Sequence, residues 1–236
     1  PLVDPAWLAD HRDDPSVHVV DVREPWEYDS IGHLPGAVNI PFDSYRDADS
    51  SDPGTLPGAD AFAQLLSEAG IAPGDTIVAY DDTHGVFAAR LLLTALAYGH
   101  ENVALLDGDF SSWQRAFKTT TESPTVEPVT HTIDSLATTA PIVDRAAVET
   151  VIDDETVTLL DTRDEAEYEE QHIPGAIRID WREFVDDESR GVRSAAEIET
   201  LLADRGISTD RDHRIILYCN TSRRLSHTFV VLRSLG

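Results

Sequence analysis

The sequence has one cysteine, no methionine and one lysine in 236 residues. A single cysteine excludes an internal disulfide, which suits a reducing compartment, and we expect a cytoplasmic protein. No apolar run reaches about 18 residues, so neither a membrane span nor a signal peptide is indicated. Because methionine is absent, the first residue is not a translation start, and we expect a processed or trimmed chain.

Positive charge is also scarce. The chain carries 44 acidic and 18 basic residues, which gives a formal net charge of −26. So acidic a surface repels nucleic acid and anionic membranes, and we expect neither as a partner. Abundant Asp and Glu with a single lysine is typical of proteins from halophiles. At about 1 M salt the screening length falls to roughly 3 Å, so an anionic substrate could still approach.

The chain contains an internal duplication. Four segments of the first half recur in order in the second: residues 1–8 at 141–148, Val19–Arg23 at Leu159–Arg163, His33–Ala37 at His172–Ala176, and Ile77–Asp81 at Ile215–Cys219. Repeats this long indicate two domains rather than a solenoid.

We therefore predict an N-terminal domain over 1–117, a Thr-, Ser- and Pro-rich linker over 118–140, and a C-terminal domain over 141–236. The second copy ends before a counterpart of Val103–Trp113. We expect that domain to be truncated at its C-terminal end, lacking one strand and one helix.

Short β-branched runs alternate with helical patterns in each copy. Val17–Val22 and Thr76–Tyr80 are predicted strands, whereas Asp60–Ala69 and Val86–Ala97 have helical spacing. This alternation predicts α/β domains, each a mainly parallel sheet with helices on both faces. Ligands bind such sheets beyond the carboxyl ends of the strands, where Cys219 is expected.

Cys219 is the candidate nucleophile. It follows the predicted strand Ile215–Tyr218 and precedes a helix predicted over Leu225–Leu235. Backbone N–H groups of such a loop, with the helix N-terminus, can surround a negative charge. Arg223 and Arg224 add full positive charges that favour a thiolate. The alternative is a buried cysteine that acts only as a small apolar side chain.

These motifs resemble the rhodanese family of sulfurtransferases in its tandem-domain form. The resemblance is carried by four features: the pair Asp21–Arg23 and Asp161–Arg163, the two His-x-Pro-Gly-Ala turns, the six-residue loop Cys219–Arg224, and Asp107–Trp113, which is similar to the family's end-of-domain signature. It implies a thiosulfate sulfurtransferase with an inactive first domain, because Asp81 stands in the place of Cys219.

By this resemblance, Cys219 takes a sulfane sulfur from thiosulfate or a similar donor and passes it to cyanide or a thiol. The resulting persulfide would be held by backbone N–H groups of the loop, which comprises Asn220, Thr221, Ser222, Arg223 and Arg224. The family implies small-molecule donors and acceptors, and a protein could also accept the sulfur. No cofactor is implied, and the histidines show no metal-ligand spacing.

Several residues near the site have a structural interpretation. Arg163 could support the site, but Arg23 recurs in the inactive copy, which favours bonds to carboxylates or loop carbonyls. His33 and His172 also recur and are expected to stabilise turns, while His227 should lie on the last helix. Asp81 and its neighbour Asp82 are expected to cap the following helix.

Two departures from the family bear on activity. Ser222 replaces a common glycine of the loop, so the backbone must turn there with a side chain present. Glu167 stands where animal sulfurtransferases have an arginine, which weighs against a carboxylate clamp for 3-mercaptopyruvate.

Three alternatives stay open. They are a 3-mercaptopyruvate sulfurtransferase, a non-catalytic sulfur-carrier or regulatory module, and phosphatase or arsenate chemistry. Four residues separate Cys219 from Arg224, one fewer than in the related phosphatases, and a loop this short favours a sulfur atom over a phosphate.

Overall fold

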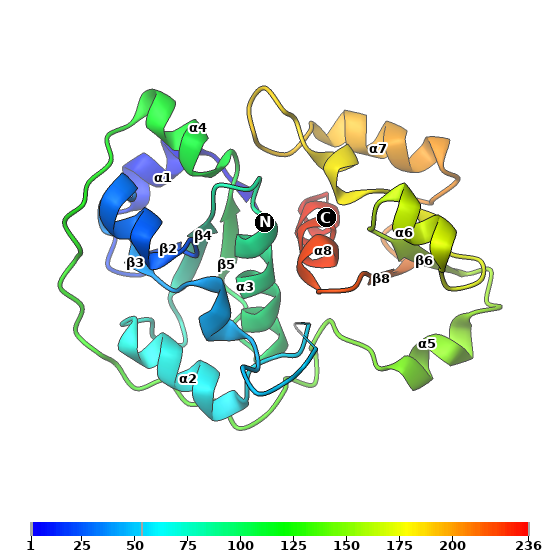
Figure 1. Ribbon diagram of the computed structural model, residues 1–236, viewed down its shortest axis with the longest axis horizontal. Coiled ribbons are helices and arrows are strands. Elements are labelled where there is room, and N and C mark those ends of the chain that lie inside the picture. Colours follow the sequence, from blue (N-terminus) through cyan, green and yellow to red (C-terminus); the bar gives the residue numbers. More distant parts are fainter. Residues whose placement is uncertain (1, 53, 236) are drawn as a thin grey trace.

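The computed structural model describes residues 2–52 and 54–235. Two α/β domains lie side by side, each around its own sheet (Figure 1). The first sheet has the order β1-β5-β4-β2-β3, and all its neighbouring strands are parallel. Its strands are β1 (Leu2–Val3), β2 (Val17–Asp21), β3 (Val38–Asn39), β4 (Thr76–Tyr80) and β5 (Val103–Leu106).

The helices of the first domain are α1 (Pro5–His11), α2 (Ala59–Glu68), α3 (Val86–Ala97) and α4 (Asp109–Ala116). Short helical turns at Glu27–Ile31 and Phe42–Tyr45 join the other elements. The side chains of β4 from Ile77 to Tyr80 are fully buried, as expected for a central parallel strand. The predicted strands and helices of this domain are thus confirmed within one or two residues.

The second domain has a three-stranded parallel sheet of order β7-β6-β8. Its strands are β6 (Val157–Asp161), β7 (Ile177–Arg178) and β8 (Arg214–Tyr218). Its helices are α5 (Arg145–Val151), α6 (Glu165–Glu170), α7 (Ala195–Asp204) and α8 (Arg223–Ser234), with a helical turn at Trp181–Phe184. No helix in residues 2–52 and 54–235 combines the length and apolar character needed to cross a membrane.

The second sheet has two strands fewer than the first, where the sequence predicts one fewer. In the first domain, β1 pairs only with β5. Ile142 and Val143 align with β1, but within the described residues 2–52 and 54–235 no counterpart of β5 lies beside them. They form no strand and are 40% and 49% exposed. An edge strand forms only when its partner strand is present. A counterpart of β1 in the second domain therefore needs a counterpart of β5.

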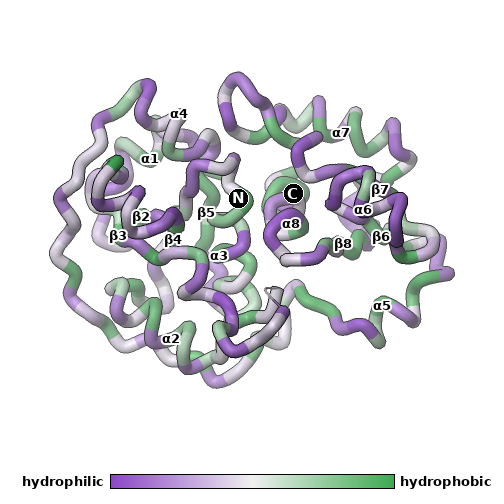
Figure 2. The backbone as a smooth tube through the Cα atoms, in the orientation of Figure 1, coloured by the Kyte–Doolittle hydropathy of each residue, from purple (hydrophilic) through white to green (hydrophobic). Residues whose placement is uncertain are grey.

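The two domains meet along α3 and α8, which pack against each other between the sheets (Figure 1). An apolar cluster of Val86, Trp181 and Val185 joins them. The Arg190 side chain of the second domain binds Asp109 of the first, with an Nη2–Oδ2 distance of 2.8 Å. Figure 2 shows hydrophobic residues along β5 and β8, which lie on either side of the packed helices α3 and α8. The packing brings the start of α8 against the first domain.

Candidate active site

Cys219 lies where β8 ends and before α8 begins, at the carboxyl edge of the second sheet. Its side chain is a free, half-buried thiol. Ser222 is the residue before α8 and has a left-handed backbone, with φ of 59°. The helix therefore begins two residues earlier than predicted, which places Arg223 and Arg224 in its first turn.

Asp81 occupies the equivalent position in the first domain and shows what the loop can hold. Its buried carboxylate accepts hydrogen bonds from four backbone N–H groups, those of Thr83, Gly85, Phe87 and Ala88, at 2.6 to 3.0 Å. Burial raises the pKa of Asp81, and these bonds oppose that effect. The turn from strand to helix thus forms a cradle for an anion in this fold.

Asp82 does not cap α3, so that part of the expectation is wrong. Its carboxylate accepts from the backbone N–H of Ser111, and it lies 3.4 Å from Arg190 of the second domain. One side chain fills the cradle, and Asp82 points to the domain interface instead.

Arg224 is paired with Glu167 of α6. It donates to both carboxylate oxygens, with an Nη2–Oε1 distance of 2.9 Å, and Asp164 lies 3.9 Å away. The side-chain amide of Asn220 donates to the same carboxylate. The bond to Glu167 is the main cause that raises the pKa of Arg224, and a Cys219 thiolate adds to it. Glu167 therefore offsets one of the two charges expected from the loop.

Arg223 turns toward the first domain. Its guanidinium carbon lies 4.8 Å from the ring centre of Phe87 and 5.4 Å from that of Phe42. Its Nε donates to the hydroxyl of Thr221 at 3.3 Å. Among the described residues no carboxylate forms an ion pair with it, so its charge is held by aromatic faces.

Arg163 repeats the bonds of Arg23. Each arginine binds the aspartate two residues before it, Asp161 or Asp21, with Nη2–Oδ2 distances of 2.6 Å, and donates to a backbone carbonyl at 2.7 Å. Arg163 also reaches the side-chain oxygen of Asn220 at 3.4 Å. It therefore contacts the loop through Asn220 while its charge is neutralised.

The three histidines considered above contact groups other than the thiol. Nδ1 of His33 is 3.0 Å from the Tyr28 carbonyl, and Nδ1 of His172 is 2.7 Å from the Tyr168 carbonyl. His227 is fully buried on α8 and faces the ring of Trp181. In the described part of the chain, no group of His, Cys, Asp or Glu is arranged to hold a metal ion.

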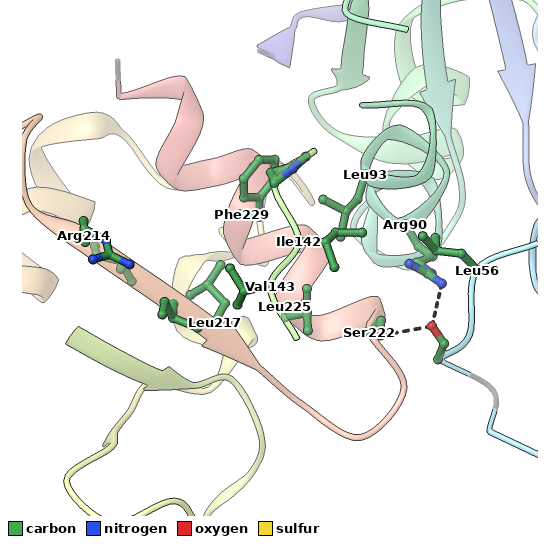
Figure 3. Close-up of a pocket in the computed structure, with 14 residues that line it drawn as sticks. Leu56, Arg90, Leu93, Ile142, Val143, Arg214, Leu217, Ser222, Leu225 and Phe229 are labelled. Carbon is green, nitrogen blue, oxygen red and sulfur yellow. Dashed lines mark hydrogen bonds between the residues drawn. The ribbon is translucent and has the colours of Figure 1, made fainter. Parts of the chain in front are cut away.

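Sequence reasoning did not identify two contributors to this site. The sequence shows Glu167 only as a departure from an arginine, and nothing in the sequence points to its bond with Arg224. Arg90 of α3 comes from the other domain and donates to the carbonyl of Gly54, beside Ser222 (Figure 3). In the sequence, the only sign of a role for Arg90 is its charge, since the residues around it in α3 are apolar.

Comparison with known proteins places both halves in one family. The rhodanese-like domain model matches residues 4–116 and 144–236. A thiosulfate sulfurtransferase of Corynebacterium glutamicum is 32% identical, covering 99% of this chain and 81% of that protein. The sulfur carrier protein TtuD of Thermus thermophilus is 29% identical, covering 99% and 87%.

Among solved structures, SseA from Escherichia coli, described as a 3-mercaptopyruvate sulfotransferase with the rhodanese fold, is similar throughout. It superposes with a TM-score of 0.83 at 27% identity, covering 99% of this chain and 94% of that one.

Proposed function

Since this chain belongs to the rhodanese-like domain family, with one domain in each half, we propose that it is a thiosulfate sulfurtransferase whose transferred sulfur is carried by Cys219. The observation that carries this proposal is the cradle of Asp81. The equivalent turn in the second domain begins with a thiol instead of a carboxylate, and it is followed by the same kind of helix N-terminus. An anionic sulfur is the natural occupant of such a turn.

The reaction would run in two displacements. The Cys219 thiolate attacks the outer sulfur of thiosulfate, a sulfur–sulfur bond forms to Cys219, and the bond to the sulfonate sulfur breaks with its electron pair, releasing sulfite. Cyanide or a thiolate then attacks the outer persulfide sulfur, and the Cys219 thiolate leaves. Both steps conserve charge and need no added oxidant or cofactor.

The charges at the loop suit this donor. Arg223 has no carboxylate partner among the described residues and lies in the first turn of α8. Its charge and the helix N-terminus would attract the sulfonate end of thiosulfate. The N–H groups from Asn220 to Arg224 are the proposed donors to the persulfide.

A 3-mercaptopyruvate sulfurtransferase is the second candidate, favoured by the likeness to SseA. Glu167 argues against it, because this carboxylate already occupies Arg224 and would repel the carboxylate of that substrate. A protein acceptor is compatible with the likeness to a sulfur carrier protein. We place the activity in the cytoplasm, where a lone cysteine stays reduced.

The test is uptake of one sulfur atom. Incubation with thiosulfate should raise the mass of the protein by one sulfur, and cyanide should remove it as thiocyanate. Because Cys219 is the only cysteine, Cys219→Ala should gain no sulfur. The same assay with 3-mercaptopyruvate ranks the two donors. A wild-type protein that gains no sulfur from either donor, or a mutant that turns over equally fast, would exclude this function.

A further inference from the structure

Arg90 is a buried cation beside the cysteine loop that comes from the other domain. It lies on α3 of the first domain and is 1% exposed. Its Nη2 donates to the Gly54 carbonyl at 2.8 Å, and the hydroxyl of Ser222 lies 3.4 Å from the same oxygen (Figure 3). One carbonyl thus links α3 to the start of α8.

Among the described residues, no carboxylate neutralises the Arg90 guanidinium. In residues 2–52 and 54–235, Arg90 takes part in no ion pair, and its buried Nε has no hydrogen-bond partner. Burying a charged group without compensation is costly, so such groups are normally paired. Arg163 and Arg224 of the same site follow that rule, with Asp161 and Glu167 as partners.

The missing negative charge is available on Cys219. Burial lowers the pKa of Arg90, and the charges of Tyr45, Cys219 and Asp52 oppose that effect. Burial also raises the pKa of Tyr45, so this phenol stays neutral, and Asp52 is exposed. Arg90 and Ser222 of the cysteine loop share the Gly54 carbonyl. A thiolate or persulfide on half-buried Cys219 is therefore the charge left to compensate the arginine, and the attraction acts on both groups.

We propose that Arg90, supplied by the domain without a cysteine, is a positioning residue of the active site that holds the loop through Gly54 and favours the anionic forms of Cys219. The first domain would then contribute to the reaction rather than serve only as a scaffold. The persulfide part of this inference rests on the proposed function, whereas the thiolate part does not.

The test is the pH profile of Cys219 alkylation by iodoacetamide, which requires no sulfur transfer. The charged and titratable groups around the loop are Arg90 on α3, Tyr98 after α3, Tyr45 after β3, Asp52 before α2, Asp161 at the end of β6, Arg163 after β6, Asp164 and Glu167 at α6, Tyr218 on β8, and Arg223 and Arg224 on α8. The variant Arg90→Gln changes only Arg90 among these groups, so a shift of the midpoint reports the loss of its charge. Its alkylation midpoint should rise by about one pH unit, a roughly tenfold lower rate below the midpoint.

Arg115→Gln is the matched control. Arg115 also belongs to the first domain and also donates across the interface to a carbonyl, that of Glu188 at 2.7 Å. It should leave the midpoint unchanged. Arg90→Lys keeps the charge and should stay close to wild type. Arg90→Met also removes the charge but leaves a long, unbranched side chain. It replaces Arg90→Gln if that variant does not fold.

An unchanged midpoint in a folded uncharged variant would overturn the inference, as would an equal shift in Arg115→Gln or Arg90→Lys. If wild type gains no sulfur from any donor while the midpoint shift is present, the proposed function fails and the thiolate role of Arg90 stands. If wild type gains sulfur but Arg90→Gln shows no midpoint shift, the proposed function stands and the role of Arg90 fails.

Discussion

Four arginines lie around the Cys219 loop, and their partners differ. Arg163 and Arg224 bind carboxylates, whereas Arg223 lies on aromatic rings and Arg90 is buried against a carbonyl. The net charge that a sulfur donor meets at the loop therefore depends on which of these arginines are paired with carboxylates. Glu167 is the residue that sets this balance at the mouth of the loop, because it binds both Arg224 and Asn220.

Removing the charge of Glu167 should improve binding of anionic donors. Glu167→Gln keeps an oxygen for Asn220 but releases the charge of Arg224, so the KM for thiosulfate should fall by about three- to tenfold at low salt, with a larger relative gain for 3-mercaptopyruvate. Steady-state kinetics with both donors would measure this. Glu165→Gln, on the exposed side of the same helix, should change neither. An unchanged or higher KM in Glu167→Gln would show that loop order outweighs charge.

At the scale of elements, α8 begins from an unfavourable backbone conformation. Ser222 has φ of 59°, in the left-handed region that suits glycine. Its hydroxyl offers only a long contact to the Gly54 carbonyl. The Ser222 side chain therefore costs stability at a position that suits glycine.

Ser222→Gly should stabilise the protein by about 1 kcal/mol, because glycine adopts this conformation without steric strain. Urea unfolding gives the free energy of unfolding. Ser194→Gly is the matched control at the start of α7, where φ is −58° and the hydroxyl accepts from the Glu197 N–H. That change should lower stability by a few tenths of a kcal/mol. A destabilised Ser222→Gly would mean that the contact to Gly54 outweighs the strain.

For the whole molecule, the interface between α3 and α8 contains a histidine that cannot readily be charged. His227 is fully buried, and neither of its ring nitrogens has a hydrogen-bond partner among the described residues. Burial lowers its pKa to about 3, and the charge of His84 acts in the same direction. Protonation of His227 thus opposes folding.

The resulting pH dependence has a defined sign. The unfolded state takes up a proton below about pH 6.5, whereas the folded state does so only near pH 3. The stability present above pH 6.5 should therefore be lost as the pH falls, by roughly 5 kcal/mol in all from this group. His227→Phe, which keeps a ring against Trp181, should flatten this part of the curve of unfolding free energy against pH.

His11→Phe is the control for that experiment, because His11 is exposed on α1. It should leave the slope of the curve unchanged. The same slope in wild type and His227→Phe would show that other groups cause the acid sensitivity.

The sequence by itself determined the features that repeat along the chain. Alternating apolar runs predicted the parallel sheets, and the duplication aligned Asp81 with Cys219 at the end of equivalent strands. These features are local, because burial on both faces of a strand and the turn that follows it are written in consecutive residues.

Only the tertiary structure decided the partners. It paired Glu167 with Arg224, placed Arg90 of the first domain beside Ser222, turned Asp82 toward Arg190, and left Ile142 and Val143 without a neighbouring strand. Each of these contacts joins elements far apart in the chain. Its energy depends on distance and burial, which a single sequence does not contain, and so the charge around Cys219 could be read only from the folded protein.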